Sequence, residues 1–435
     1  MKKLFLLALP MALAAVSCSN EEVVSVNNDA NEITFAAVVN NATRANTDSM
    51  YCNNWKPGSF HVWALAKDAD NTVVGKTSYF QEVRYDANAG KSLWSAADQA
   101  NIRFWPNEGA SMLDFYIMHN YNGSIQWKPT EATTTVPRLA VEGYTLTNDV
   151  AKQEDFIYSV LQNQTKPDNV GTVGINFRHA LSQVVFKARN TNKSIHVEIG
   201  EVYVKNFYNK GNFALPLLTT DNNLVDHNST NKEGSEGVIT PNAGTVGTWT
   251  NVTADAKVST SKVAVYPTKN SANQETAAEP HYAVVKYTAN SSEATNLTDG
   301  VDTGVKATRD FSKAMLFIPQ TLTKGETVPS GTGKVDEDKT NPYFVIKCKI
   351  WNVDGGADGT AGFDKDHDVC IYDGYAYIPV DATWEAGKKY IYTFVFGGRN
   401  GGYDEDGKDV LVPISFTVTV DDFTPIVEKD VNMFQ

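Results

Sequence analysis

The sequence is poor in positive charge and in long apolar segments. Its 38 Lys and Arg residues are outnumbered by 51 Asp and Glu residues, which gives a formal net charge of −13. An acidic surface repels phosphate backbones and anionic lipid headgroups, so nucleic acid is excluded as a partner. Beyond the N-terminus no run approaches about 18 apolar residues, the length that a transmembrane helix needs. The rest of the chain is therefore predicted to be soluble or anchored at a surface.

Catalytic signatures are missing as well. The sequence has no G-x-S-x-G motif, and its seven histidines are dispersed, with no pair at a metal-binding spacing. The segment PSGTGKVDED has the GK pair of a phosphate-binding loop, but Val328 stands where that loop needs Gly. Val335 likewise stands where the loop needs Ser or Thr to hold magnesium. The sequence thus predicts neither an enzyme nor a bound cofactor.

The chain is rich instead in short runs that alternate apolar and polar residues. Clusters of Asn, Gly, Asp, Thr and Pro separate these runs, a pattern typical of an all-β sandwich or barrel. Two clear examples are Met112–His119 and Ile195–Lys205. Within the second run the apolar phase slips at Gly200, which predicts a β-bulge. In the run Pro413–Val420 the apolar positions 414, 416, 418 and 420 are predicted to form one buried face.

The N-terminus is typical of an exported protein. Two lysines precede an apolar run that ends at Val16, so residues 1–17 are predicted to be a signal peptide. The segment AVSC, which ends at Cys18, resembles a bacterial lipobox, in which the cysteine is lipidated and becomes the new N-terminus. An ordinary cleavage site beside a chance cysteine is the alternative. The following SNEE resembles an acidic export tag for surface lipoproteins.

Two further cysteines are a candidate disulfide. Cys348 precedes the Gly- and Asp-rich segment DGGADGTAGFDKDHDVC, and Cys370 is the last residue of that segment. A hairpin centred near Gly359 would place them opposite each other, where a disulfide requires close Cα and Cβ atoms. Buried free thiols are the alternative, and the sequence does not decide between the two.

The same segment carries the weak metal candidates Asp364, Asp366 and Asp368. Their alternation could direct three carboxylates at a hard cation such as calcium. The EF-hand pattern is not met, because Val369 stands at its glycine position and the closing Glu is absent. A solvated hairpin loop is therefore the favoured interpretation, and no metal is predicted.

Several segments, in order along the chain, resemble the fimbrillin family, the subunits of type V pili of Bacteroidales. They are EITFAAVVNNATRA, WKPGSFHVWAL, FWPNEGASMLDFYIM, DFIYS, INFRHALSQVVFKARN, MLFIPQTL, WEAGKKYIYTFVF and FTVTVDDF. No single motif identifies the family, but the occurrence of all of them in this order behind a lipobox is specific to it. The resemblance covers residues from about 32 to 423.

The resemblance implies two transthyretin-like β-sandwich domains in tandem. The polar, turn-forming segment near residues 167–172 is then the predicted boundary, between domains at 32–168 and 169–435. Residues 18–44 would form a lipidated segment that includes a removable first strand. The plugging side chains of that strand would be those of Ile33, Phe35, Ala37 and Val39.

The resemblance also implies how such a subunit is processed. Arg44, in the polar segment NNATRANTD, matches the position at which an outer-membrane arginine-specific protease cuts, before Ala45. Removal of the strand would leave a groove that a strand from another fimbrial subunit, of the same or a related kind, fills by β-strand addition. The alternative for Arg44 is that it is merely a loop arginine.

Together these observations predict a structural or adhesive subunit of a cell-surface fimbria. It would reach the outer membrane through the lipoprotein export machinery and then enter the fimbrium, with a host or bacterial surface ligand as a further partner. The runner-up is a permanently anchored surface lipoprotein that binds glycan or host ligands. The sequence does not distinguish shaft, tip and anchor subunits.

Overall fold

The computed structural model of the chain is almost entirely built of β-strands. It describes residues 31–37, 57–67, 79–88, 93–106, 112–128, 138–166, 172–175, 177–216, 247–253, 256–265, 282–298, 314–325, 334–353, 363–397, 402–410 and 414–422. These residues contain no α-helix. Their only helical elements are single 3-10 turns: η2 (Gln99–Asn101), η3 (Val150–Lys152), η5 (Ser291–Glu293) and η6 (Val335–Glu337). The predicted all-β class is confirmed.

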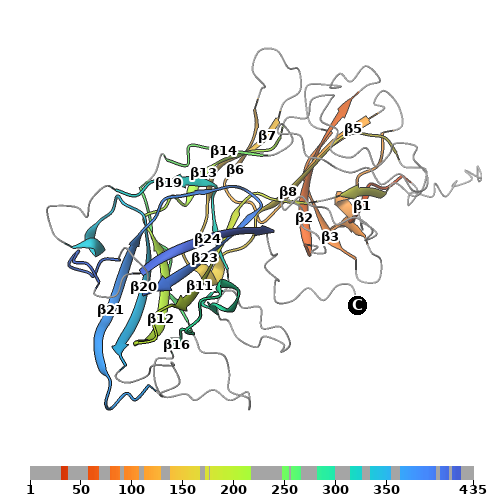
Figure 1. Cartoon of the computed structure of the whole chain (residues 1–435). Helices are drawn as coiled ribbons and strands as arrows, with labels where there is room; N and C mark the ends of the chain where they lie inside the picture. The colour runs from red at the N-terminus through yellow and green to blue at the C-terminus, as the bar shows by residue number, and fades with distance from the viewer. Residues whose placement is uncertain are drawn as a thin grey trace, which may run out of the picture.

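The first part of the chain forms most of an eight-stranded sheet, in the order β10-β8-β5-β2-β3-β4-β1-β9. Its strands are β1 (Thr34–Ala37), β2 (Ser59–Lys67), β3 (Phe80–Ala87), β4 (Trp94–Ala96), β5 (Met112–His119), β8 (Ile157–Gln164), β9 (Thr172–Ile175) and β10 (Arg178–His179). In Figure 1 the strands β1, β2, β3 and β5 lie on the opposite side of the molecule from β12, β20 and β21. Because β1 lies between β4 and β9 in the strand order, the first described strand is an internal strand of this sheet.

The remaining strands form four smaller sheets. One has the order β17-β11-β23-β24, with β18 beside β11. A second has the order β15-β12-β20-β21, with β16 beside β12. A third has the order β14-β13-β7-β6, and the last pairs β19 with β22. The bounds are β6 (Ser124–Lys128), β7 (Arg138–Thr145), β11 (Ser182–Asn190), β12 (Ile195–Lys205), β13 (Lys210–Ala214), β14 (Thr248–Thr250), β15 (Val263–Ala264), β16 (Ala283–Val284), β17 (Thr295–Asn296), β18 (Met315–Phe317), β19 (Gln320–Leu322), β20 (Tyr343–Asn352), β21 (Val369–Pro379), β22 (Ala382–Trp384), β23 (Lys388–Phe396) and β24 (Ile414–Asp422).

Strand pairing does not divide at the predicted boundary near residue 168. After it, β9 pairs with β1, β10 with β8, and β13 with β7. Figure 1 shows β13 and β14 beside β6 and β7. Turn-forming composition marks a connection without telling whether the next strand returns to the same sheet, so the boundary near 168 stays a prediction. The tandem arrangement itself stays a prediction.

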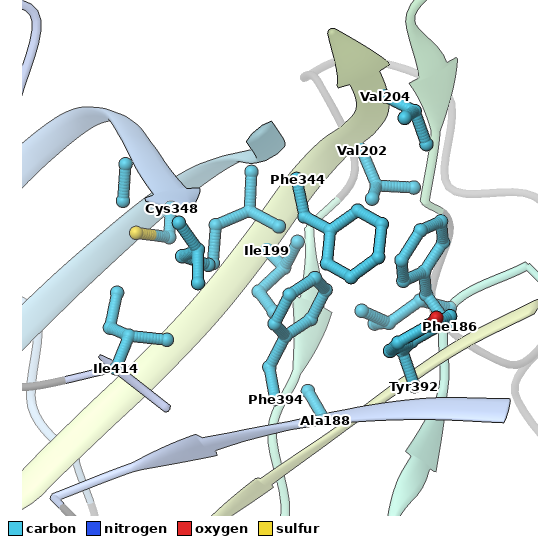
Figure 2. Close-up of a cluster of buried hydrophobic side chains, with 14 of the residues drawn as sticks. Phe186, Ala188, Ile199, Val202, Val204, Phe344, Cys348, Tyr392, Phe394 and Ile414 are labelled. Atoms are coloured by element: carbon cyan, nitrogen blue, oxygen red, sulfur yellow. The ribbon is translucent and has the colours of Figure 1, made fainter. Parts of the chain in front are cut away.

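One hydrophobic core, called the C-terminal core below, lies among β11, β12, β20 and β23. Phe186, Phe344, Tyr392 and Phe394 are buried there, and Figure 2 shows their side chains gathered between the strands. The rings of Phe186 and Phe394 stack with centroids 5.4 Å apart, and that of Phe344 stands edge-on to Phe186 at 4.9 Å. Offset and edge-on contacts of this kind stabilise a core beyond the burial of their area.

Several expected strands have the predicted bounds. The runs Met112–His119 and Ile195–Lys205 are β5 and β12, and the register of β12 against β20 shifts between Ile199 and Glu201, which confirms the bulge at Gly200. The predicted buried face of β24 is wrong in part. Ile414 is buried there, but Val418 is 48% exposed. Alternation identifies residues that share a face, and nothing among the described residues covers that face at Val418.

Candidate functional site: the slot of the first strand

Strand β1 lies between β4 and β9 in the eight-stranded sheet. It runs parallel to β9, with Cα partners from Thr34 opposite Thr172 to Ala37 opposite Ile175. Its antiparallel contact with β4 is a single pair, Phe35 opposite Trp94. Backbone pairing on the β4 side is therefore short, and other contacts must hold the strand there.

The side chains of Ile33 and Phe35 supply those contacts. Both are fully buried. The Phe35 ring stands edge-on to Phe60, Tyr85 and Phe115, with centroids 5.7, 4.8 and 5.3 Å away. Full burial of one such side chain is worth about 1.5–3 kcal/mol, and edge-on aromatic pairs add to this. Phe35 thus fills the space between the rings of Phe60, Tyr85 and Phe115, which is called the slot below. Without Phe35 these rings would be open to water.

The slot is uncharged at its centre. Burial raises the pKa of Tyr85, so its phenol stays neutral at physiological pH. Its hydroxyl has no hydrogen-bond partner among the described residues. Trp94, by contrast, donates its indole N–H to the carbonyl of Pro57 at 2.8 Å. A slot of this chemistry favours large apolar side chains on the strand that fills it.

Hydrogen bonds fix the start of the strand from two directions. The amide of Ile33 donates to the carbonyl of Arg103 at 2.8 Å, and the amide of Trp105 donates to the carbonyl of Asn31 at 2.9 Å. On the other side the hydroxyls of Thr34 and Thr172 are 2.8 Å apart. These bonds and the ladder with β9 set the register of the strand, while the buried side chains of Ile33 and Phe35 anchor it in the core.

Strand β9 depends on β1 for its pairing. Among the described strands it pairs with β1 alone, which makes it the edge of the sheet. Sequence reasoning did not assign Thr172–Ile175 to a strand. The signal was the alternation of Val173, Ile175 and Phe177, all of which are buried. If β1 left, the hydrogen-bonding edges of both β9 and β4 would be exposed.

The structure describes only some of the residues predicted for this site. Ile33 and Phe35 are buried in the slot as expected, and the backbone of Ala37 is paired to Ile175. Val39, Arg44, Ala45 and Cys18 lie outside the described residues. The lipidation and cleavage positions therefore stay predictions.

The candidate disulfide is contradicted by the strand register. Cys348 lies opposite Gly374, and Cys370 lies opposite Trp351. Both thiols are free: that of Cys348 is buried in the C-terminal core and that of Cys370 is exposed. β20 and β21 do pair antiparallel, but their register differs from the expected one and shifts between Ile350 and Trp351, so the two cysteines do not face each other.

The three aspartates of the acidic segment lie in a turn that hydrogen bonds among them stabilise. Asp364 accepts from the amide of Asp366 at 3.0 Å, and its second oxygen lies 2.7 Å from the His367 ring. Asp368 accepts from the amide of Asp364 at 2.8 Å. Over the described part of the chain no group of three or more His, Cys, Asp or Glu residues could hold a metal ion.

In that same part, no helix has the length and apolar character to cross a membrane.

Both a family model and solved structures match the chain. The model of the fimbrillin-like family matches residues 43–422. No curated protein sequence matches. A fimbrial protein from Bacteroides vulgatus aligns over 89% of this chain and 99% of its own, with 14% identity and a TM-score of 0.48. The tip fimbrial protein Mfa3 from Porphyromonas gingivalis, with its C-terminus truncated, aligns over 89% of this chain and 99% of its own, with 8% identity and a TM-score of 0.28. Because the family match extends over most of the sequence, the chain belongs to the fimbrillin-like family, a family of structural and adhesive proteins rather than enzymes.

Proposed function

We propose that this chain is a subunit of a cell-surface fimbria whose precursor carries its first strand as a removable plug. A lipid on Cys18 holds the precursor at the outer membrane, and an arginine-specific protease cuts between Arg44 and Ala45. A strand from another fimbrial subunit then fills the emptied slot by β-strand addition. The supporting observation is the full burial of Phe35, on a short strand between β4 and β9, and of Ile33 directly before that strand.

An uncut precursor cannot take part in this exchange, because its own strand occupies the slot. Removal of β1 would expose the aromatic rings that now surround Phe35, together with the unpaired edges of β4 and β9. Exposed apolar surface and an open sheet edge both favour association with a further strand. Cleavage would therefore convert a closed monomer into one that binds its neighbour.

The geometry of the slot restricts the strand that could enter it. The incoming strand must run parallel to β9 and antiparallel to β4 to reproduce the present pairing. It must also place large apolar side chains at the positions of Ile33 and Phe35, which point to the same face of the sheet. A polar side chain at the second position would lie against Tyr85 and Phe115 without a partner.

The test is replacement of Arg44 by Ala in the full chain, expressed in cells that assemble the fimbria. We expect the SDS-resistant high-mass ladder to disappear and the lipidated precursor to accumulate. Arg84→Ala is the matched control, since the Arg84 side chain is exposed and forms an ion pair with Asp86 at 2.7 Å. That variant should assemble normally.

An unchanged ladder in the Arg44→Ala variant would show that cleavage at this arginine is not required. A wild-type protein that remains lipidated at Cys18 in its abundant surface form, with no ladder, would instead favour the anchored, ligand-binding lipoprotein. These two results are distinct, because the first leaves assembly intact and the second excludes it.

A further inference from the structure

Three polar side chains meet on neighbouring strands of the eight-stranded sheet, at a distance from the slot of β1. Lys67 is the last residue of β2, Asp114 lies in β5 and Asn163 lies in β8, and β5 pairs with both of the other strands. The Lys67 side chain is 1% exposed and that of Asp114 is fully buried. Lysine is among the residues that are almost never fully buried without a specific partner.

The three groups are in direct contact. The Lys67 ammonium nitrogen lies 2.5 Å from Oδ2 of Asp114 and 3.3 Å from Oδ1 of Asn163. The second carboxylate oxygen of Asp114 accepts from the backbone amide of Asn163 at 2.8 Å. Asn163 has a φ of +52°, in the left-handed region, and the register of β5 against β8 shifts at this point. A bulge of this kind re-aims a side chain, here toward the lysine.

We propose that Lys67 and Asn163 form an intramolecular isopeptide bond, with Asp114 as the group that carries protons between them. The Lys67 nitrogen lies 3.3 Å from Oδ1 of Asn163, the oxygen bonded to the Cγ atom that it would attack, and a side chain held in this way needs little further movement to react. The fold therefore places all the reactants together, and the reaction needs no cofactor or oxidant.

The reaction balances within the three side chains. The Asp114 carboxylate first takes a proton from the Lys67 ammonium, which leaves a neutral amine. The amine nitrogen attacks Cγ of Asn163, and the C–N bond of the amide group breaks after Asp114 returns its proton to the leaving nitrogen. Asp114 then takes the remaining extra proton from the new amide nitrogen. One C–N bond forms, one breaks, and one molecule of ammonia is released.

The surroundings suit each step. Burial raises the pKa of the Asp114 carboxyl, although its contact with Lys67 opposes this, so the protonated acid is accessible as an intermediate and as the final state. Asn163 is only half-buried, which leaves ammonia a path to solvent. The product also removes the charge of a buried lysine, which is costly to keep out of water.

The bond would join β2 to β8 across β5. Hydrogen bonds between strands separate under load, whereas a covalent bridge across three strands does not. Such a bridge would hold this sheet together in a protein that bears tension at the cell surface. The proposal does not depend on cleavage at Arg44 or on strand exchange, because β3 and β4 separate the strands β8, β5 and β2 from β1 in the sheet.

Peptide mapping by mass spectrometry of the digested full-chain protein tests the bond. We expect a branched peptide that contains Lys67 and Asn163, with a mass lower by one ammonia than the sum of its two linear parts. Linear peptides with unmodified Lys67 and Asn163 would overturn the proposal. A loss of water in a peptide that joins Lys67 to Asp114 would also overturn it, since the acceptor would be the wrong residue.

Variants separate the roles of the three residues. Asn163→Ala should abolish the branched peptide because no acceptor remains, and Asp114→Asn should abolish it because no proton carrier remains. Asn120→Ala is the matched control, since Asn120 also adopts a left-handed φ, of +53°. The branched peptide should persist in this variant, and its loss there would count against the assignment. The wild-type measurement decides the question even if a variant fails to fold.

Discussion

Strands β1 and β24 lie near opposite ends of the described chain and are held in opposite ways. β24 pairs with β23 along its whole length, from Ile414 opposite Phe396 to Asp422 opposite Lys388. β1 has four residues, which pair with β9 throughout and with β4 at Phe35 alone, and the side chains of Phe35 and of the preceding Ile33 are fully buried. The first strand therefore combines a short backbone pairing with fully buried side chains, whereas the last has a long backbone pairing and a side chain, Val418, that is half exposed.

This difference bears on which strand can be exchanged. A long antiparallel ladder fixes many backbone groups at once, and its loss would leave the edge of β23 without a partner. A short strand that is anchored by two buried side chains can be replaced by any strand that places similar side chains at the positions of Ile33 and Phe35. The slot of β1 is therefore defined by its aromatic pocket, and the comparison with β24 is open to test by substitution.

The largest effect is expected for Phe35→Ala in the uncut chain. Loss of the ring would leave a cavity against Phe60, Tyr85 and Phe115, and truncation of a buried Phe costs about 3–5 kcal/mol of the free energy of unfolding. Urea denaturation of wild type and variant measures it. A cost below about 1 kcal/mol would show that the strand is held by its backbone after all.

Phe416→Ala in β24 should cost less. Its ring is half-buried and contacts Phe344 and Tyr392 at centroid distances of 5.4 and 5.5 Å. Since part of the side chain is already in water, the expected loss is about 1–2 kcal/mol in the same denaturation experiment. A loss equal to that of Phe35→Ala would remove the contrast between the two strands.

A smaller effect is expected for Thr34→Val, which removes the hydroxyl contact with Thr172 at 2.8 Å. One hydrogen bond contributes about 0.5–1.5 kcal/mol, so the variant should be slightly destabilised. A double-mutant cycle with Thr172→Val isolates the pairwise contribution. Additive losses from the two substitutions would mean that the hydroxyls do not interact.

The smallest effect is expected for Val418→Ser. The side chain is 48% exposed, so little apolar area returns to water, and the free energy of unfolding should change by no more than about 0.5 kcal/mol. Thermal denaturation of the full chain is sufficient to detect anything larger. A large loss would indicate that another part of the protein covers this face of β24.

The sequence predicted the all-β class and the bounds of β5 and β12, because alternating apolar residues and a glycine phase slip are local signals. It did not predict that β13 returns to pair with β7, since strand order depends on contacts far apart in the chain. The register that separates Cys348 from Cys370 was missed for the same reason. At the candidate site, the burial of Ile33 and Phe35 was expected, whereas the lone pairing of β9 with β1 and the contact of Lys67 with Asp114 had no local signature.

The N-terminus of the assembled form tests the central claim most directly. SDS-resistant oligomers would be isolated from the cell surface and their first residue identified by mass spectrometry. Our account predicts that the chain begins at Ala45, with residues 31–37 absent from the oligomer. An assembled chain that still begins at a lipidated Cys18 and retains Ile33 and Phe35 would contradict it.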